Sequence, residues 1–358
     1  MRDIATLHKL AIKGFATKNP IFVCVISYSA TSEIPGITVA GANPEMVKYT
    51  SPADAEFLYY GHCKCIDTVP ATPDGKPTPA LITRAALQEG NIPFLVVDAG
   101  TRVKPSIPFV SFGLEPGRNI INENAMDYSM VRRAFEYGEL LGKQLAALSD
   151  LVVIGESIPG GTTTALAVLN ALGIDARFKV SSSMPENPHE LKNGVVAAAI
   201  KRAGTVGSSY EAVAAYGDPM LPSVAGIASG AVDAGGRVIL AGGTQMSAVV
   251  AILKHNGKPL DKLCIGTTTY VARDPTADLA GLVSSISKQV PIFSCDLHLG
   301  ESIKSGLQAF AKGFVKEGVG AGGASIAAMI KSKGRITGKR LLRSIEKEYE
   351  TSIEIARH

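Results

Sequence analysis

The chain has 358 residues, a length typical of about two domains, and 46% of them are hydrophobic, which suffices for a large core. Its net charge of +4 is too small to indicate nucleic-acid binding, and no apolar run approaches the ~18–20 residues of a membrane span. Five cysteines, an odd number, argue against a disulfide framework. Because the start of the chain does not resemble a signal peptide, we expect a cytoplasmic protein.

The first 150 residues predict helices separated by short strands and two long irregular stretches. Residues 27–51 and 101–124 contain no periodic element, and loops of that length in a compact protein are usually functional. Apolar periodicity predicts helices over 3–17, 52–60, 79–90 and 127–148, and short apolar runs predict strands over 21–26 and 94–97.

The remainder of the chain alternates between predicted strands and helices. The predicted strands are 151–154, 238–241, 263–266 and 292–295, and the predicted helices are 165–172, 189–202, 219–234, 245–255, 275–288, 303–315, 324–330 and 337–357.

This alternation predicts an α/β fold with a doubly wound, mainly parallel sheet in a Rossmann-like three-layer arrangement. We expect residues 20–330 to form the α/β domain, and residues 1–19 and 331–358 to form a small helical lobe. The basic residues of the last helix are interpreted as a solvated face. In such sheets, ligands bind beyond the carboxyl ends of the strands.

The stretch from Leu151 to Gly173 carries the strongest functional signal. A buried strand is followed by Gly155, Gly160 and Gly161, by three threonines, Thr162, Thr163 and Thr164, and then by a helix. A helix N-terminus preceded by glycines can hold a phosphate, because its free N–H groups and partial positive charge face the anion. An ordinary strand-to-helix turn is the alternative interpretation.

Residues 155–162 nearly match the Walker A pattern, but Gly161 occupies the position of the lysine. Without that lysine a triphosphate loses its main cationic partner. We therefore predict a mononucleotide or sugar-phosphate site.

Other motifs give weaker signals. Asp98 and the pair Gly242 and Gly243 also follow predicted strands. Gly318, Gly320 and Gly323 match G-x-G-x-x-G after a helical pattern, where the dinucleotide fold needs a strand, so the match is interpreted as accidental. His62, Cys63 and Cys65 lie close together without a second pair at zinc spacing, and no metal or cofactor is expected.

Several collinear motifs from about Phe94 to Ile330 resemble one family. The run IGESIPGGTTTALA is similar to the GEMGIGNTTTAAA signature of the nicotinate-nucleotide:dimethylbenzimidazole phosphoribosyltransferases. Four further segments resemble that family's motifs in the same order, namely VVDAG at 96–100, GRNI at 117–120 with Ala125 and Met126, AGG at 241–243, and EGVGA at 317–321.

The resemblance implies an α/β sheet, a homodimer and a role in the synthesis of the lower ligand of cobamides. An azole base would attack nicotinate mononucleotide at the ribose anomeric carbon, releasing nicotinate. Glu317 would be the catalytic base, because ribosylation of one azole nitrogen requires removal of the proton from the other. Glu156 would stabilise the positive charge of the transition state. The nucleotide would be held by Gly160 to Thr164, Gly242, Gly243, Gly318 and Gly320, with Asp98 and Ser27 as further candidate binding residues.

The sequence departs from the bacterial pattern mainly in its N-terminal third, where it resembles the archaeal branch. Gly161 replaces an asparagine, and Gln245 replaces an acidic residue. The accepting base therefore stays open between dimethylbenzimidazole and adenine. A nucleotide hydrolase or base-exchange enzyme and a non-catalytic nucleotide-binding protein are the alternatives, and the two glutamates favour an enzyme.

Overall fold

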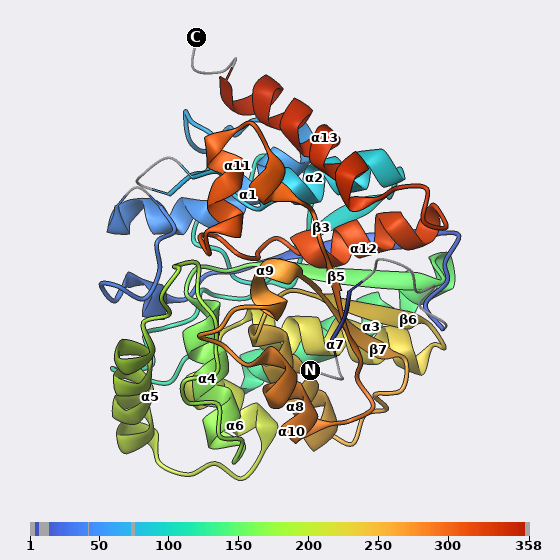
Figure 1. Ribbon diagram of the computed structural model, residues 1–358. Helices are drawn as coiled ribbons and strands as arrows, with labels where there is room; N and C mark the ends of the chain where they lie inside the picture. The colour runs from blue at the N-terminus through green and yellow to red at the C-terminus, as the bar shows by residue number, and fades with distance from the viewer. Residues whose placement is uncertain (1–3, 7–13, 42, 73–75, 355–358) are drawn as a thin grey trace.

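The computed structural model describes residues 4–6, 14–41, 43–72 and 76–354, and these build one eight-stranded sheet (Figure 1). Every neighbouring pair of these strands is parallel. Their order is β1-β8-β7-β6-β5-β2-β3-β4. The strands are β1 (Ile4–Thr6), β2 (Pro20–Ile26), β3 (Phe94–Asp98), β4 (Val110–Ser111), β5 (Leu151–Ser157), β6 (Arg237–Ala241), β7 (Leu263–Thr268) and β8 (Ile292–Cys295).

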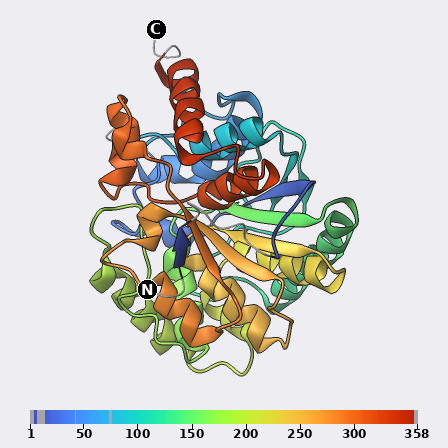
Figure 2. The ribbon, with the colours of Figure 1, turned by 45° about the vertical axis from the view of Figure 1, so that its right-hand side comes forward.

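Helices cover both faces of the sheet, as Figure 2 shows from a second direction. One layer contains α1 (Thr50–Tyr60), α2 (Ala80–Gly90) and α12 (Ala321–Lys331), with α13 (Gly338–Tyr349) on the outside of α2 and α11 (Ser305–Ala311) beside them. The other contains α3 (Tyr128–Leu148), α4 (Gly161–Ala171), α5 (His189–Ala203), α6 (Ser209–Tyr216), α7 (Met220–Asp233), α8 (Gln245–His255) and α10 (Leu279–Ile286). The short helix α9 (Thr269–Ala272) follows β7. The predicted doubly wound α/β fold is confirmed.

The central strand β5 shows why the sheet is buried on both faces. Its apolar residues alternate between two cores: Leu151 and Val153 pack in the core that contains α12, and Val152 and Ile154 pack in the core that contains α7. Side chains of a strand point alternately to opposite faces, so a continuous apolar run fits a strand covered on both sides.

The strand order reverses between β2 and β5. The chain runs outward from β2 to β3 and β4, and then from β5 to β8 in the opposite direction. At such a switch point the connections leave the sheet on opposite sides and open a crevice beyond the carboxyl ends of the strands.

The N-terminal prediction is wrong where the structure tests it. Residues 4–6 form strand β1, parallel to β8, where a helix over 3–17 was expected. Residues 7–13 lie outside the described part of the chain. The predicted tail helix ends earlier, at Tyr349, and continues as a turn of π-helix over Glu350–Glu354. The division into an α/β domain and a separate lobe stays a prediction.

None of the described helices has the length and apolar character needed to cross a membrane.

Candidate active site

A cavity of about 500 Å³ lies at the switch point of the sheet. Its walls include the end of β5, the turns that follow β6 and β7, the loops and helix that follow β2, and the loop that precedes α12. The predicted site residues in its lining are Glu156, Gly160, Gly161, Thr162, Gly243, Glu317 and Gly318.

Two helix N-termini meet at one part of the cavity. Helix α4 begins at Gly161, after Gly160 in a left-handed conformation with φ of 71°, and helix α8 begins at Gln245. A Cβ added to Gly161 would lie 3.1 Å from Gln245 Oε1, which places the two ends side by side. Because the N-terminal end of a helix carries partial positive charge, this part of the cavity is suited to an anion.

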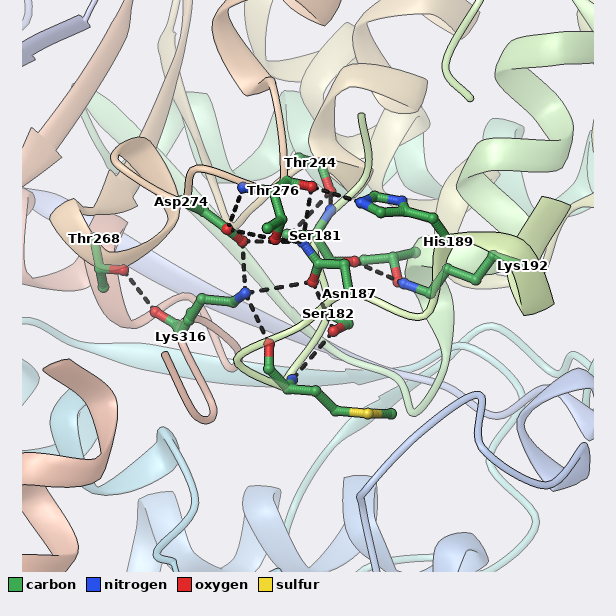
Figure 3. Close-up of polar contacts among 12 residues, drawn as sticks. Ser181, Ser182, Asn187, His189, Lys192, Thr244, Thr268, Asp274, Thr276 and Lys316 are labelled. Carbon is green, nitrogen blue, oxygen red and sulfur yellow. Dashed lines mark hydrogen bonds and ion pairs between the residues drawn. The ribbon is translucent and has the colours of Figure 1, made fainter. Parts of the chain in front are cut away.

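Lys192 of α5 places a cation behind the Gly-rich turn: it does not line the cavity itself, but it contacts Thr162 and Ser181, which do. Its ammonium group is buried and donates to Thr162 Oγ1 and to the Ser181 carbonyl oxygen, both at 2.7 Å (Figure 3). These contacts use two of its three N–H donors. Burial, followed by the charge of Lys316, lowers the pKa of Lys192 to about 7.

Lys192 was missed in the sequence analysis, although a signal was present. The residue shares the buried face of its helix with Val195, Val196 and Ala199, at the spacing of one apolar stripe. A lysine in that phase of an amphipathic helix is buried, and a buried lysine needs a polar partner.

Glu317 lies in the loop before α12 and is held by the end of β7. Its carboxylate accepts hydrogen bonds from the backbone N–H of Thr268 at 2.9 Å, of Gly322 at 3.1 Å and of Gly318 at 3.3 Å. The hydroxyl of Thr267 donates at 3.3 Å. Burial raises the pKa of Glu317 to about 7 in spite of these hydrogen bonds, which suits a group that exchanges protons near neutral pH.

Glu156 lies at the end of β5, and its backbone carbonyl accepts from the N–H of Val319 at 2.9 Å. Burial and then the neighbouring carboxylates of Glu317, Asp218 and Asp54 hold its pKa well above the ordinary value. The structure therefore brings the two predicted catalytic glutamates to one cavity, close enough for the Glu317 carboxylate to raise the pKa of Glu156. Bound positive charge near this cluster would favour ionised carboxylates.

Asp54 is a buried carboxyl that the sequence analysis did not single out. It lines the cavity from α1, and it accepts from Thr78 Oγ1 at 2.6 Å and from Ser157 Oγ at 2.7 Å. Burial raises its pKa to about 6. Thr50, one turn earlier on α1, also lines the cavity, and its buried hydroxyl has no hydrogen-bond partner in the described part of the protein.

The remaining predicted site residues do not line the cavity. Thr163 and Thr164 are buried in α4, and Thr164 donates to Asp218. Gly242 and Gly320 permit close packing, since a Cβ would lie 2.8 Å from Met246 and from Gly155, respectively.

Asp98 and Ser27 make contacts within the protein. Asp98 forms an ion pair with Lys104 at 2.5 Å and accepts a hydrogen bond from the backbone N–H of Thr101. Ser27 donates a hydrogen bond to the Ala99 carbonyl oxygen at 2.7 Å. These contacts hold the loops after β2 and β3 in place behind the cavity lining.

Comparisons with known proteins agree with the resemblance found in the sequence. A family model described as a phosphoribosyltransferase matches residues 82–308. A UPF0284 protein of Archaeoglobus fulgidus is 50% identical over 92% of this chain and 93% of its own length. A second, from Sulfurisphaera tokodaii, is 46% identical over 92% of this chain and 93% of its own length.

Among solved structures, the nicotinate-nucleotide-dimethylbenzimidazole phosphoribosyltransferase from Thermus thermophilus has a similar fold. Its TM-score is 0.61 at 18% identity, and the match covers 92% of this chain and 84% of that one. At this identity the likeness supports the fold alone.

Proposed function

The chain belongs to the phosphoribosyltransferase family, and from this premise we propose that it moves the 5-phosphoribosyl group of nicotinate mononucleotide to a nitrogenous base. The products would be nicotinate and an α-riboside phosphate for cobamide synthesis. The observation that carries the proposal is one cavity that combines the N-terminus of α4 at Gly161 with the carboxyl of Glu317, while Lys192 lies behind the lining residues Thr162 and Ser181.

The nucleotide phosphate is proposed to bind at the N-termini of α4 and α8. Lys192 does not line the cavity, but its ammonium donates to the lining residues Thr162 and Ser181, and its positive charge behind them would favour a phosphate there. Gly160 and Gly161 let the ligand approach the backbone, and Gly243 extends this surface toward the ribose.

The reaction then needs one bond exchange and one proton transfer. An azole nitrogen attacks the anomeric carbon, the bond from that carbon to nicotinate breaks, and its electron pair neutralises the pyridinium nitrogen. The proton on the other azole nitrogen goes to Glu317, which is poised for this by its pKa of about 7. Glu156 would stabilise the cationic anomeric carbon.

The accepting base is proposed to lie against α1 and the loop before α12. This part of the lining combines the apolar residues Ala53 and Val319 with the polar side chains of Asp54 and Thr50. A flat heterocycle with polar edge atoms fits this lining, and both dimethylbenzimidazole and adenine belong to that class.

Chromatography of incubations with nicotinate mononucleotide tests the proposal. We expect free nicotinate together with a riboside phosphate only when dimethylbenzimidazole or adenine is added. Release of nicotinate without any base would identify a hydrolase instead. Binding of the nucleotide with no release under any condition would identify a non-catalytic nucleotide-binding protein.

We further propose that the protein is a homodimer, as the family resemblance implies. Light scattering at micromolar concentration should give twice the chain mass of 37.3 kDa. A mass equal to one chain would exclude the dimer.

A further inference from the structure

The loop that carries Glu317 has a strained backbone on both sides of the carboxylate. Val315 has φ of 47° and Val319 has φ of 52°, in the left-handed region that β-branched residues rarely adopt. Such conformations persist only where the surrounding structure holds them. The contacts that hold this loop therefore decide where the Glu317 carboxylate lies.

Lys316, the neighbour of Glu317, makes the most extensive of these contacts. Its ammonium donates to Asp274 Oδ2 at 2.5 Å, to the Met184 carbonyl at 2.9 Å and to Asn187 Oδ1 at 3.3 Å (Figure 3). Both side chains of the ion pair with Asp274 are only 2% exposed. All three N–H donors of Lys316 are used, so its ammonium has none left for a substrate.

The acceptors of Lys316 are themselves fixed to a second wall of the cavity. Asn187 donates to Asp274 Oδ2 at 3.1 Å and accepts from Ser182 Oγ at 2.7 Å. Asp274 also accepts from the backbone N–H of Thr276 at 2.9 Å. Ser182 lines the cavity, so this network links the loop of Glu317 to the wall beside Lys192.

The backbone of the same loop is tied at two further points. The N–H of Val315 donates to the Ser183 carbonyl at 2.9 Å, and the hydroxyl of Thr268 donates to the Lys316 carbonyl at 2.6 Å. The backbone N–H of Thr268 in turn donates to Glu317 at 2.9 Å. A displacement of Lys316 would therefore also disturb the hydrogen bond between Thr268 and Glu317.

We propose that Lys316, through its buried ion pair with Asp274, is a positioning residue that holds Glu317 in its proton-accepting place. The expected effect on the rate rests on the proposed function. The expected effect on the position of the Glu317 carboxylate rests on the contacts described above. A misplacement of about 1 Å can lower a rate by roughly 10²-fold. Removal of the ammonium would also leave the Asp274 carboxylate buried without its cation.

The test compares Lys316→Met with Lys312→Met, a change of an exposed lysine in the preceding turn. We expect Lys316→Met to lower kcat by roughly 10²-fold, with the KM for nicotinate mononucleotide within about threefold of the parent, since the phosphate is held elsewhere. Lys312→Met should change neither value. Asp274→Asn should give the same pattern, and it serves as the second variant if Lys316→Met does not fold.

A double-mutant cycle separates positioning from a general loss of structure. If Lys316 acts through Glu317, Lys316→Met should change the rate of a Glu317→Gln enzyme by less than about threefold. A full 10²-fold loss in that background would overturn the proposal, as would a kcat within threefold of the parent in a folded Lys316→Met protein.

A crystal structure of Lys316→Met gives a readout that does not need the reaction. We expect the Glu317 carboxylate to leave the backbone N–H groups of Thr268 and Gly322. An unmoved carboxylate would overturn the positioning role even if the parent enzyme is active. Absence of nicotinate release from the parent would overturn the proposed function. The position of the Glu317 carboxylate in the crystal structure of Lys316→Met would still test the positioning role of Lys316.

Discussion

Glu317 is the residue on which the proposed chemistry depends most directly. Glu317→Gln preserves the shape of the side chain but removes its ability to accept a proton near neutral pH. We expect turnover to fall by roughly 10²–10⁴-fold, the usual contribution of a general base. Affinity for nicotinate mononucleotide, measured by calorimetry, should stay within about threefold. Turnover within threefold of the parent at saturating base would make Glu317 an ordinary loop residue.

The pH profile of kcat/KM offers an independent check on two residues. Glu317 must lose its proton to act as a base, and burial raises its pKa to about 7, so activity should fall below that pH. The positive charge of Lys192 would favour phosphate binding, and burial lowers the pKa of Lys192 to about 7, so activity should also fall above that pH. We expect a narrow bell-shaped profile centred near pH 7. Because the groups share one site, the two apparent pKa values of the profile belong to the site as a whole.

Variants assign the limbs of that bell. Lys192→Met should remove the alkaline limb and raise KM for the nucleotide, whereas Glu317→Gln should remove the acidic limb from the residual activity. A profile that stays flat from pH 6 to pH 8 in the parent protein would contradict both assignments.

The residues of the site differ in how far sequence alone could identify them. Glu156 follows a predicted strand, and Glu317 was identified through the resemblance of EGVGA to a family motif. Lys192 and Asp54 come from helices that flank the sheet, and only tertiary packing brings them to the Gly-rich turn and to Ser157. Helical spacing indicates that Lys192 is buried, but it does not indicate which distant residues become its partners.

At the scale of elements, the N-terminus of α4 can be tested by substitution. A Cβ at Gly161 would lie 2.7 Å from Ile158 Cγ2 and 3.1 Å from Gln245 Oε1. Gly161→Val should therefore push the turn away from α8 and weaken binding of nicotinate mononucleotide by at least tenfold, about 1.4 kcal/mol. A thermal-shift titration measures this, and affinity within threefold of the parent would contradict the phosphate assignment.

Gly173 offers a matched control for that substitution. It lies just after the other end of the same helix, and a Cβ there would meet no atom within 4 Å. Its φ of 78° is left-handed, so Gly173→Asn, which tolerates that region, is the appropriate change. We expect Gly173→Asn to leave nucleotide affinity unchanged.

The sequence predicted helices and strands correctly where the apolar periodicity was strong. It failed where pairing with a strand distant in sequence determined the secondary structure. The helix over Gln245–His255 and the strand over Ile292–Cys295 match their predicted bounds. Residues 4–6 have a sequence compatible with either a helix or a strand, and their parallel pairing with β8 makes them a strand. Helix α6 was not predicted.

At the scale of the molecule, the class of fold follows from the alternation of strands and helices, but the order of the strands does not. The neighbours β2 and β5 are separated in sequence by two other strands, and only this pairing creates the switch point at which the cavity lies. Sequence reasoning located candidate loops at strand ends, and the topology determined which of them share one cavity.

The buried carboxyls around that cavity lead to a prediction about the stability of the ligand-free protein. Burial raises the pKa of both Asp54 and Asp218 to about 6, above the usual range near 4 that we expect in the unfolded chain. Between these values the folded state binds more protons than the unfolded state. The free energy of unfolding therefore increases as pH falls from 6.5 to 5, by about 1 kcal/mol for each carboxyl.

Glu317, whose pKa burial raises to about 7, and Glu156, whose pKa is held well above its ordinary value, bind protons over the same window and add to this increase. Carboxyls held below their ordinary pKa, such as Asp274 and Asp150, lose stabilising charge mainly below pH 5. Lys192 is mostly protonated in both states below pH 6.5, because its folded pKa is about 7. Calorimetry should thus show a melting temperature that rises by roughly 2 °C or more between pH 6.5 and pH 5. Asp54→Asn should reduce that rise, and a fall over the same interval would show that these carboxyls are not buried as described.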